Sequence, residues 1–258
     1  MSLFDLADKV AVITGSSKGI GRAIAERLAE HGAKVVISSR RADACEEVAV
    51  GIRAKGAEAF VHPCNVSRKE ELKGLVDATL AHWGRIDILV CNAAANPHYG
   101  PLAAISDEAM QKTLTTNVTG IVWLSNLVLP QMAERRDGVI LIISSVGGFI
   151  GSDLLGFYNM SKAAEQSLAR SLAYEWGESN IRVNCIAPGL IKTDFSRALW
   201  QDEDALARRT ATSALKRMGE ADEIAGTAVY LAARAGSFVT GQTIVVDGGR
   251  LIGVLPRD

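Results

Sequence analysis

Short hydrophobic runs alternate along the chain with longer stretches in which hydrophobic positions recur at helical spacing. The short runs are continuously apolar, which is typical of strands covered on both faces in a parallel sheet. They are residues 10–14, 34–38, 57–62, 86–91, 138–144, 181–186 and 243–246. The helical stretches between them are residues 21–31, 43–54, 68–83, 106–133, 158–177 and 221–233. Strands and helices in strict succession predict an α/β fold with a doubly wound parallel sheet and helices on both faces.

Residues 190–217 fit this alternation poorly, since they follow a predicted strand but are rich in charged residues and threonine. Ligands of open α/β sheets bind beyond the carboxyl ends of the strands, where this segment would lie. We expect it to cover a substrate, with an ordinary surface excursion as the alternative. No internal repeat or flexible linker interrupts the chain, so its 258 residues predict a single domain.

The charge balance and the scattered cysteines argue against several classes of protein. A formal net charge of -1 gives no basis for expecting nucleic acid or an anionic membrane as a partner. The N-terminus carries acids instead of the apolar core of a signal peptide, and no apolar run approaches the length of a membrane span. The four cysteines lack C-x-x-C spacing, and the four histidines lack paired metal-ligand spacing. These features predict a cytoplasmic protein with reduced thiols and no bound metal.

A glycine-rich turn, residues 14–21, follows the first predicted strand and opens the first predicted helix. Its sequence is Thr-Gly-Ser-Ser-Lys-Gly-Ile-Gly, with the spacing G-x-x-x-G-x-G. Glycine lets a backbone turn sharply and approach a pyrophosphate, and the start of a helix offers free N–H groups to the phosphates. Glycines also serve close packing between helix and strand, but the position of this cluster favours a dinucleotide site.

The end of the second predicted strand bears on which nicotinamide cofactor would bind. An acid at this point would bind the ribose 2′-hydroxyl of NAD. This strand instead ends in Ser38, Ser39, Arg40 and Arg41. An arginine here can bind a 2′-phosphate through two hydrogen bonds, and Lys18 in the glycine-rich turn can add a second positive charge. Either cation alone could be a solvated surface residue, but together they favour NADP(H) over NAD(H).

Tyr158 and Lys162 are four residues apart and therefore lie on one face of a predicted helix. A neighbouring ammonium favours the phenolate and lowers the pKa of a tyrosine, which suits a general acid or base. Ser145 follows the fifth predicted strand, where its hydroxyl could hold a substrate oxygen. A packed ring beside a solvated lysine and a serine that ends a strand are the structural alternatives for these residues.

The motifs taken together resemble the short-chain dehydrogenase/reductase family. The resemblance rests on the glycine-rich turn, Asn92-Ala-Ala, Ser145, the Tyr158-x-x-x-Lys162 pair and Pro188-Gly189, and it extends from Lys9 to Gly249. It implies a Rossmann fold, hydride transfer at the nicotinamide and a catalytic tetrad of Asn117, Ser145, Tyr158 and Lys162. By this resemblance Tyr158 donates the proton and Ser145 polarises the carbonyl. Lys162 lowers the pKa of Tyr158 and binds the ribose, and Asn117 orders a water relay, although a helix kink or a core hydrogen bond would also explain Asn117.

The residues expected to bind the cofactor combine the glycine-rich turn, the end of the second strand and the further family matches. They are Gly15, Ser17, Lys18, Gly19, Ile20, Gly21, Ser39, Arg40, Asn65, Val66, Asn92, Ala93, Ala94, Tyr158, Lys162, Pro188, Gly189, Ile191 and Thr193. The segments around Asn92 and Pro188 are similar to those of NADPH-dependent carbonyl and retinal reductases. The family resemblance also implies a homotetramer, with interfaces on the helices 106–133 and 158–177 and on residues 251–256.

The residues of the chain are therefore compatible with three functions. The first is reversible reduction of a ketone or aldehyde with NADP(H). The second is reduction of a 3-oxoacyl thioester, for which Arg197, Arg208 and Arg209 could contact a phosphopantetheine carrier. The third is a non-catalytic NADP-binding sensor or scaffold, which the presence of all four tetrad residues disfavours.

Overall fold

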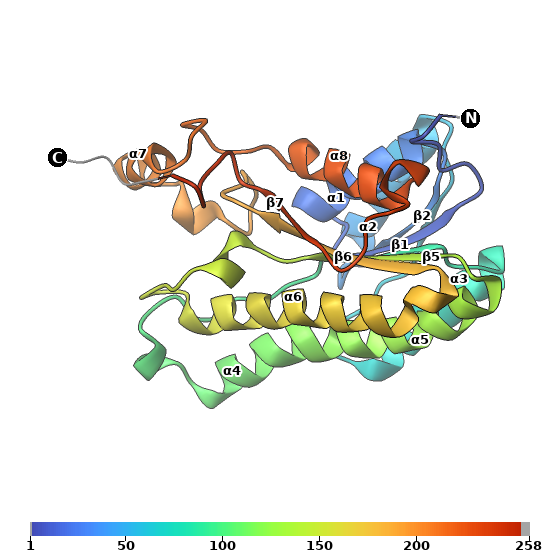
Figure 1. Ribbon diagram of the computed structural model, residues 1–258, viewed down its shortest axis with the longest axis horizontal. Helices are drawn as coiled ribbons and strands as arrows, with labels where there is room; N and C mark the ends of the chain where they lie inside the picture. Colours follow the sequence, from blue (N-terminus) through green and yellow to red (C-terminus); the bar gives the residue numbers. More distant parts are fainter. Residues whose placement is uncertain (1, 254–258) are drawn as a thin grey trace.

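Seven parallel strands form the sheet of the computed structural model, which describes residues 2–253 (Figure 1). Across the sheet they run in the order β3 (Ala59–Val61), β2 (Lys34–Ser38), β1 (Val10–Thr14), β4 (Ile88–Cys91), β5 (Gly138–Ile143), β6 (Ile181–Pro188) and β7 (Thr243–Val246). The chain proceeds outward from β1 in one direction and then returns to continue from β4 in the other. Loops therefore diverge between the carboxyl ends of β1 and β4, where ligands of such sheets bind.

Helices cover both faces of the sheet, as predicted (Figure 1). One face carries α1 (Gly19–Glu30), α2 (Ala42–Ala54) and α8 (Ala221–Ala232), and the other carries α3 (Lys69–Trp83), α5 (Gly120–Arg135) and α6 (Gly156–Trp176). Successive strand residues point to opposite faces, so Leu141 packs into the first of two hydrophobic layers and Ile142 into the second. Burial on both faces explains why the strands read as continuous apolar runs.

The long helix predicted for residues 106–133 is interrupted. Residues Asp107–Leu114 form α4, Thr115–Thr119 form a single π-helical turn, and Gly120 begins α5. Four of the five residues in this π-turn are β-branched, and the fifth is Asn117, whose side chain is buried and bonded to the backbone of Ala95. The wider turn places that amide at the carboxyl edge of the sheet, and π-turns occur often at functional sites.

Residues 190–217, called here the covering segment, extend beyond the carboxyl end of β6. Within it lie a short 3-10 turn at Arg197–Leu199 and a helix that the hydrophobic pattern did not predict, α7 (Glu203–Ala211), seen at the left of Figure 1. A single bridge between Ile191 and Gly219 closes the base of the segment. Within residues 2–253 no helix is both long and apolar enough to cross a membrane.

Candidate active site

The glycine-rich turn packs against the end of β4 without room for side chains at two of its glycines. Gly15 has a φ of +66°, and a Cβ there would lie 2.9 Å from Asn92 Nδ2. A Cβ on Gly21 would lie 2.5 Å from the carbonyl oxygen of Gly15 and would also collide with Asn92 Nδ2. Glycine is therefore required for the chain to turn from β1 into α1 at this distance from β4.

Thr14 and Asn92 fasten the ends of β1 and β4 together. Thr14 Oγ1 accepts hydrogen bonds from the backbone N–H groups of Asn92 and Ala93, at 3.0 and 3.2 Å. Asn92 Nδ2 donates to the carbonyl oxygens of Thr14 and Gly15, at 2.9 and 3.1 Å. Ala94 follows as a partly buried residue. The sequence-predicted residues 92–94 and the glycine-rich turn are thus brought together.

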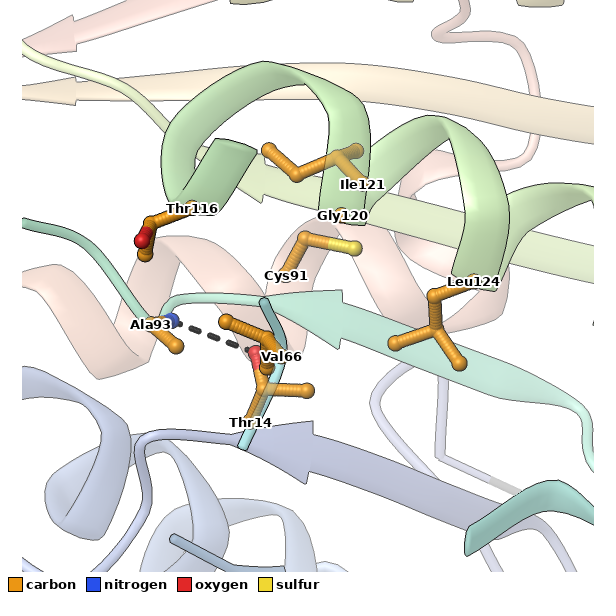
Figure 2. A pocket seen from close by; sticks show the side chains of 8 residues that line it. All are labelled: Thr14, Val66, Cys91, Ala93, Thr116, Gly120, Ile121 and Leu124. Carbon is orange, nitrogen blue, oxygen red and sulfur yellow. Dashed lines mark hydrogen bonds between the residues drawn. The ribbon is translucent and has the colours of Figure 1, made fainter. Parts of the chain in front are cut away.

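A cavity of about 10 Å³ lies behind this junction, among Thr14, Val66, Cys91, Ala93, Thr116, Gly120, Ile121 and Leu124. Figure 2 shows the Ala93–Thr14 hydrogen bond on one side of it and the π-turn and α5 on the other. The volume is about that of one water-sized probe, so the cavity is too small for a substrate. It shows instead that the region beneath residues 92–94 is closely packed.

The N-terminus of α1 is open to a phosphate. Its N-cap residue is Lys18, and no side chain caps the first N–H groups of the helix. Ser17 and Ile20 are partly buried beside it, while Lys18 is exposed. Free N–H groups at the positive end of a helix dipole bind anions, so the turn fits the pyrophosphate of a dinucleotide.

The two cations predicted near a 2′-phosphate are both on the surface. Arg40 is exposed after β2, and Ser39 before it is partly buried, with its Oγ 3.1 Å from Cys45 Sγ. Lys18 Nζ lies 3.3 Å from Asp194 Oδ2 in the covering segment, and both side chains are more than half exposed. An exposed ion pair of this kind is weak, so Lys18 can turn to another anion at little cost.

The remaining cofactor-binding candidates lie on either side of the glycine-rich turn. Asn65 Oδ1 accepts from Ser67 N at 3.1 Å, and Val66 lines the cavity behind residues 92–94. On the other side, β6 ends at Pro188, and a Cβ on Gly189 would lie 2.7 Å from Asp247 Cα. Ile191 is buried, and Thr193 Cγ2 would lie 3.3 Å from a Cβ on Gly19. The start of the covering segment therefore contacts the glycine-rich turn.

Tyr158, Lys162 and Ser145 meet beyond the end of β5. Lys162 Nζ lies 5.5 Å from the centre of the Tyr158 ring, one turn further along α6. Burial raises the pKa of Tyr158, as does the nearby carboxylate of Glu165, and together they outweigh the ammonium of Lys162 and a hydrogen bond with Ser145, which both lower it. The expected proximity of the pair is confirmed, but the pKa of Tyr158 stands above its ordinary value in the free protein, contrary to the simple expectation from the lysine.

The side chain of Asn117 makes three hydrogen bonds. Its Oδ1 accepts from Ala95 N at 2.8 Å, and its Nδ2 donates to Ala95 O and to Ser161 Oγ, both at 3.0 Å. Ser161 lies between Tyr158 and Lys162 on α6. The side chain therefore links the loop after β4 to α6, which is the core hydrogen bond considered for Asn117 from the sequence.

Glu165 is a residue of this site that the sequence did not single out. Its carboxylate accepts hydrogen bonds from Lys162 Nζ at 2.8 and 3.1 Å, and both side chains are buried. Burial raises the pKa of Glu165 to about 7, although the Lys162 ammonium acts to lower it. Its position three residues after Lys162 was the available signal, because that spacing returns to the same face of a helix.

Known proteins resemble this chain in sequence and in structure. The family model described as Enoyl-(Acyl carrier protein) reductase matches residues 15–250. Dehydrogenase/reductase SDR family member 4 of Bos taurus is 42% identical over 246 residues, which cover 95% of this chain and 88% of the relative. The human SDR family member 2, a mitochondrial protein, is 39% identical over 94% of this chain and 86% of its own length. A gluconate 5-dehydrogenase from Burkholderia cenocepacia, solved with NADP and tartrate, superposes with a TM-score of 0.93 at 32% identity, covering 97% of this chain and 98% of the other.

Proposed function

The chain belongs to the short-chain dehydrogenase/reductase family, and we propose that it is an NADP(H)-dependent oxidoreductase that reversibly reduces a ketone or aldehyde. The observation that carries this proposal is the meeting of Tyr158, Lys162 and Ser145 beside the dinucleotide-binding turn. A phenol next to a buried ammonium is suited to exchange a proton with a substrate oxygen.

The proposed reaction assigns one role to each of these residues. The bound nicotinamide would supply a hydride to the carbonyl carbon, or accept it in the reverse direction. Ser145 holds the carbonyl oxygen through its hydroxyl. Tyr158 gives its proton to that oxygen as the C=O bond becomes a C–O–H group, and the resulting phenolate is stabilised by the Lys162 ammonium. Asn117 holds the loop after β4 against α6 through its hydrogen bonds to Ala95 and Ser161.

NADP(H) is the proposed cofactor because the residues present fit its phosphates. The glycine-rich turn leads directly into α1, whose uncapped N-terminus offers N–H groups to the pyrophosphate. Arg40 and Lys18 are exposed near the ends of β2 and β1, where they can bind a 2′-phosphate. The carboxylate that would bind a free 2′-hydroxyl is missing from residues 38–41.

The covering segment is proposed to close over an apolar substrate. The Phe195 ring centre lies 6.3 Å from that of Tyr158, although the Phe195 side chain is still half exposed. Trp200 Nε1 donates to Thr193 O at 3.2 Å, which folds the segment back on its first residues. Apolar side chains above the proton donor would exclude water from the reacting carbonyl.

A specific feature favours the 3-oxoacyl thioester as the second candidate substrate. Arg208, Arg209, Thr212 and Arg250 line a cavity of about 280 Å³ at the covering segment. Of the three arginines considered from the sequence, Arg208 and Arg209 lie there, whereas Arg197 pairs with Asp194 at 3.3 Å. Guanidinium groups around one opening suit the phosphate of a carrier or of a coenzyme.

The test is oxidation of NADPH with a panel of ketones, aldehydes and 3-oxoacyl thioesters, with NADH in parallel. We expect turnover with NADPH that falls by about 10²- to 10⁴-fold in Tyr158→Phe while NADPH binding is retained. The best substrate decides between the two reductase functions. NADPH binding without any turnover would instead favour the sensor, and equal use of NADH would contradict the roles given to Lys18 and Arg40.

We further propose that the protein forms a homotetramer in the cytoplasm. Met160 and Tyr174 on α6 are exposed apolar residues, with Tyr174 at 95%, and a second copy of the chain could cover them. Of the C-terminal interface expected from the sequence, residues 254–256 lie outside the described part of the chain. Sedimentation of the purified protein would give the number of subunits.

A further inference from the structure

The carboxylate of Glu165 is buried next to the catalytic lysine, although the proposed reaction assigns it no role. The side chains of Lys162 and Glu165 are 2% and 1% exposed. A buried ion pair costs several kcal/mol in desolvation, and a hydrophobic pair of similar volume is often as stable. Stability therefore gives no sufficient reason for an acid at this position.

The contacts of Lys162 leave its ammonium without a free proton in the unliganded protein. Nζ donates to the carbonyl oxygen of Ile143 at 3.0 Å and to Glu165 Oε1 and Oε2 at 2.8 and 3.1 Å. A lysine ammonium has three protons to donate. Glu165 accepts two of these hydrogen bonds, so it holds the ammonium group in one orientation and also balances its charge.

The electrostatic surroundings show that Glu165 acts on Tyr158. Burial raises the pKa of Tyr158, Lys162 lowers it, and Glu165 raises it again. The other titratable groups near the pair are the thiols of Cys91 on β4 and Cys185 on β6, with Arg170 further along α6 acting on Cys185. Burial and Glu165 both raise the pKa of these thiols, so they are uncharged at neutral pH. Lys162 and Glu165 are thus the charges that decide the protonation of Tyr158.

We propose that Glu165 is a positioning residue that holds Lys162 and offsets its charge, so that Tyr158 remains a protonated acid and carbonyl reduction is favoured over alcohol oxidation. This inference rests on the proposed function for the role of Tyr158. The ammonium and the carboxylate form a neutral unit beside the phenol. A lysine without this partner would stabilise the phenolate, the form that takes a proton from an alcohol.

The test compares Glu165→Gln with the unchanged protein, and it uses Glu175→Gln as a control because Glu175 is an exposed acid on the same helix. The ionisation of Tyr158 is followed by tyrosinate absorbance without cofactor or substrate, after subtraction of the Tyr158→Phe titration. We expect Glu165→Gln to lower the pKa of Tyr158 by about one unit or more, while the control leaves it unchanged. The pH profile of alcohol oxidation should move to lower pH by the same amount.

A second variant keeps the test decisive if Glu165→Gln does not fold. In the double variant Lys162→Met/Glu165→Leu both charges are removed together, so the pair stays neutral at the pH at which Tyr158 ionises. We expect the pKa of Tyr158 to change by less than about one unit. A rise of two units or more would overturn the proposal, because it would mean that Lys162 acts on Tyr158 unopposed. An unchanged pKa in folded Glu165→Gln would overturn it as well. Both titrations are independent of turnover, so their failure is distinct from failure of the proposed function.

Discussion

Asn117 Nδ2 donates a hydrogen bond to Ser161 Oγ at 3.0 Å, and this bond joins the π-turn to α6 between Tyr158 and Lys162. Ser161 Oγ in turn donates to the carbonyl oxygen of Tyr158 at 2.7 Å. Asn117 is therefore connected to Tyr158 through the backbone of the helix that carries Tyr158.

Substitution of Ser161 by alanine should damage both stability and catalysis. Ser161 is fully buried, and Ser161→Ala leaves one proton of Asn117 Nδ2 without its acceptor. An unpaired buried donor costs about 1–3 kcal/mol. We expect the free energy of unfolding in urea to fall by that amount and kcat to fall more than KM rises. Ser171→Ala is the matched control, since Ser171 is an exposed serine of the same helix, and equal effects of the two variants would contradict the role given to Ser161.

Alanine in place of Gly21 should abolish cofactor binding or folding. Its Cβ would lie 2.5 Å from Gly15 O, within the junction of the glycine-rich turn and β4. A Cβ on Gly51 in α2 would meet no atom outside its own helix turn within 4 Å, so Gly51→Ala should stabilise the protein by up to about 1 kcal/mol through helix propensity. Thermal unfolding and NADPH binding measured on both variants check this contrast. Normal NADPH affinity in Gly21→Ala would refute the packing described here.

Removal of the positive charges of Lys18 and Arg40 should weaken the binding of NADPH and leave the binding of NADH nearly unchanged. In the double variant Lys18→Ala/Arg40→Ala, charge-assisted hydrogen bonds to the 2′-phosphate are lost, which corresponds to about a 10- to 100-fold rise in KM for NADPH. KM for NADH should change by less than about threefold, since NADH has no such phosphate. Arg41→Ala serves as the control, because Arg41 pairs with Asp43. A parallel loss of both cofactors would show that the cations act on the common pyrophosphate.

The thiols should be unreactive while the protein is folded. Burial raises the pKa of Cys64 and of Cys185 to about 12, and Cys45 and Cys91 are also buried. At pH 8 the thiolate that reacts with disulfide reagents is then a very small fraction of Cys64 and of Cys185, and burial shields Cys45 and Cys91 from the reagent. We expect no rapid modification by a disulfide reagent in the native protein and four reactive thiols per chain after unfolding in urea. Rapid native modification would mean that one of these sites opens.

The fold could be predicted because its determinants are local and repeated. Strands such as β5, whose residues are all buried, read as uninterrupted apolar runs, and each is followed by a helix with one apolar face. The π-turn could not be predicted, since Thr115–Thr119 has no glycine or proline to mark a break and its cause is a hydrogen bond to Ala95, distant in sequence. Helix α7 was missed because its residues are mostly polar or charged.

The site was predicted less completely than the fold. Tyr158, Lys162 and Ser145 could be recognised because their spacing is fixed by one helix and one strand end. Glu165 does not stand out in the sequence because a glutamate in a helix is usually solvated. Its spacing of three residues from Lys162 is the one sign that it shares the face of that lysine. Glu165 lies within the buried face of α6, which is formed by residues 159, 161, 162, 165, 166, 169, 172 and 173. The balance between its charge and that of Lys162 depends on burial, which sequence spacing does not give.

The contact between Gly19 and Thr193 also bears on how this protein could be engineered. Thr193 stands against the glycine-rich turn, while Phe195, two residues later, is half exposed over Tyr158. The boundary between residues constrained by packing against the glycine-rich turn and residues free to vary therefore falls between these two positions. A library that diversifies residues 195–211 would alter the shape presented to a substrate and leave the sheet, the glycine-rich turn and Tyr158 untouched.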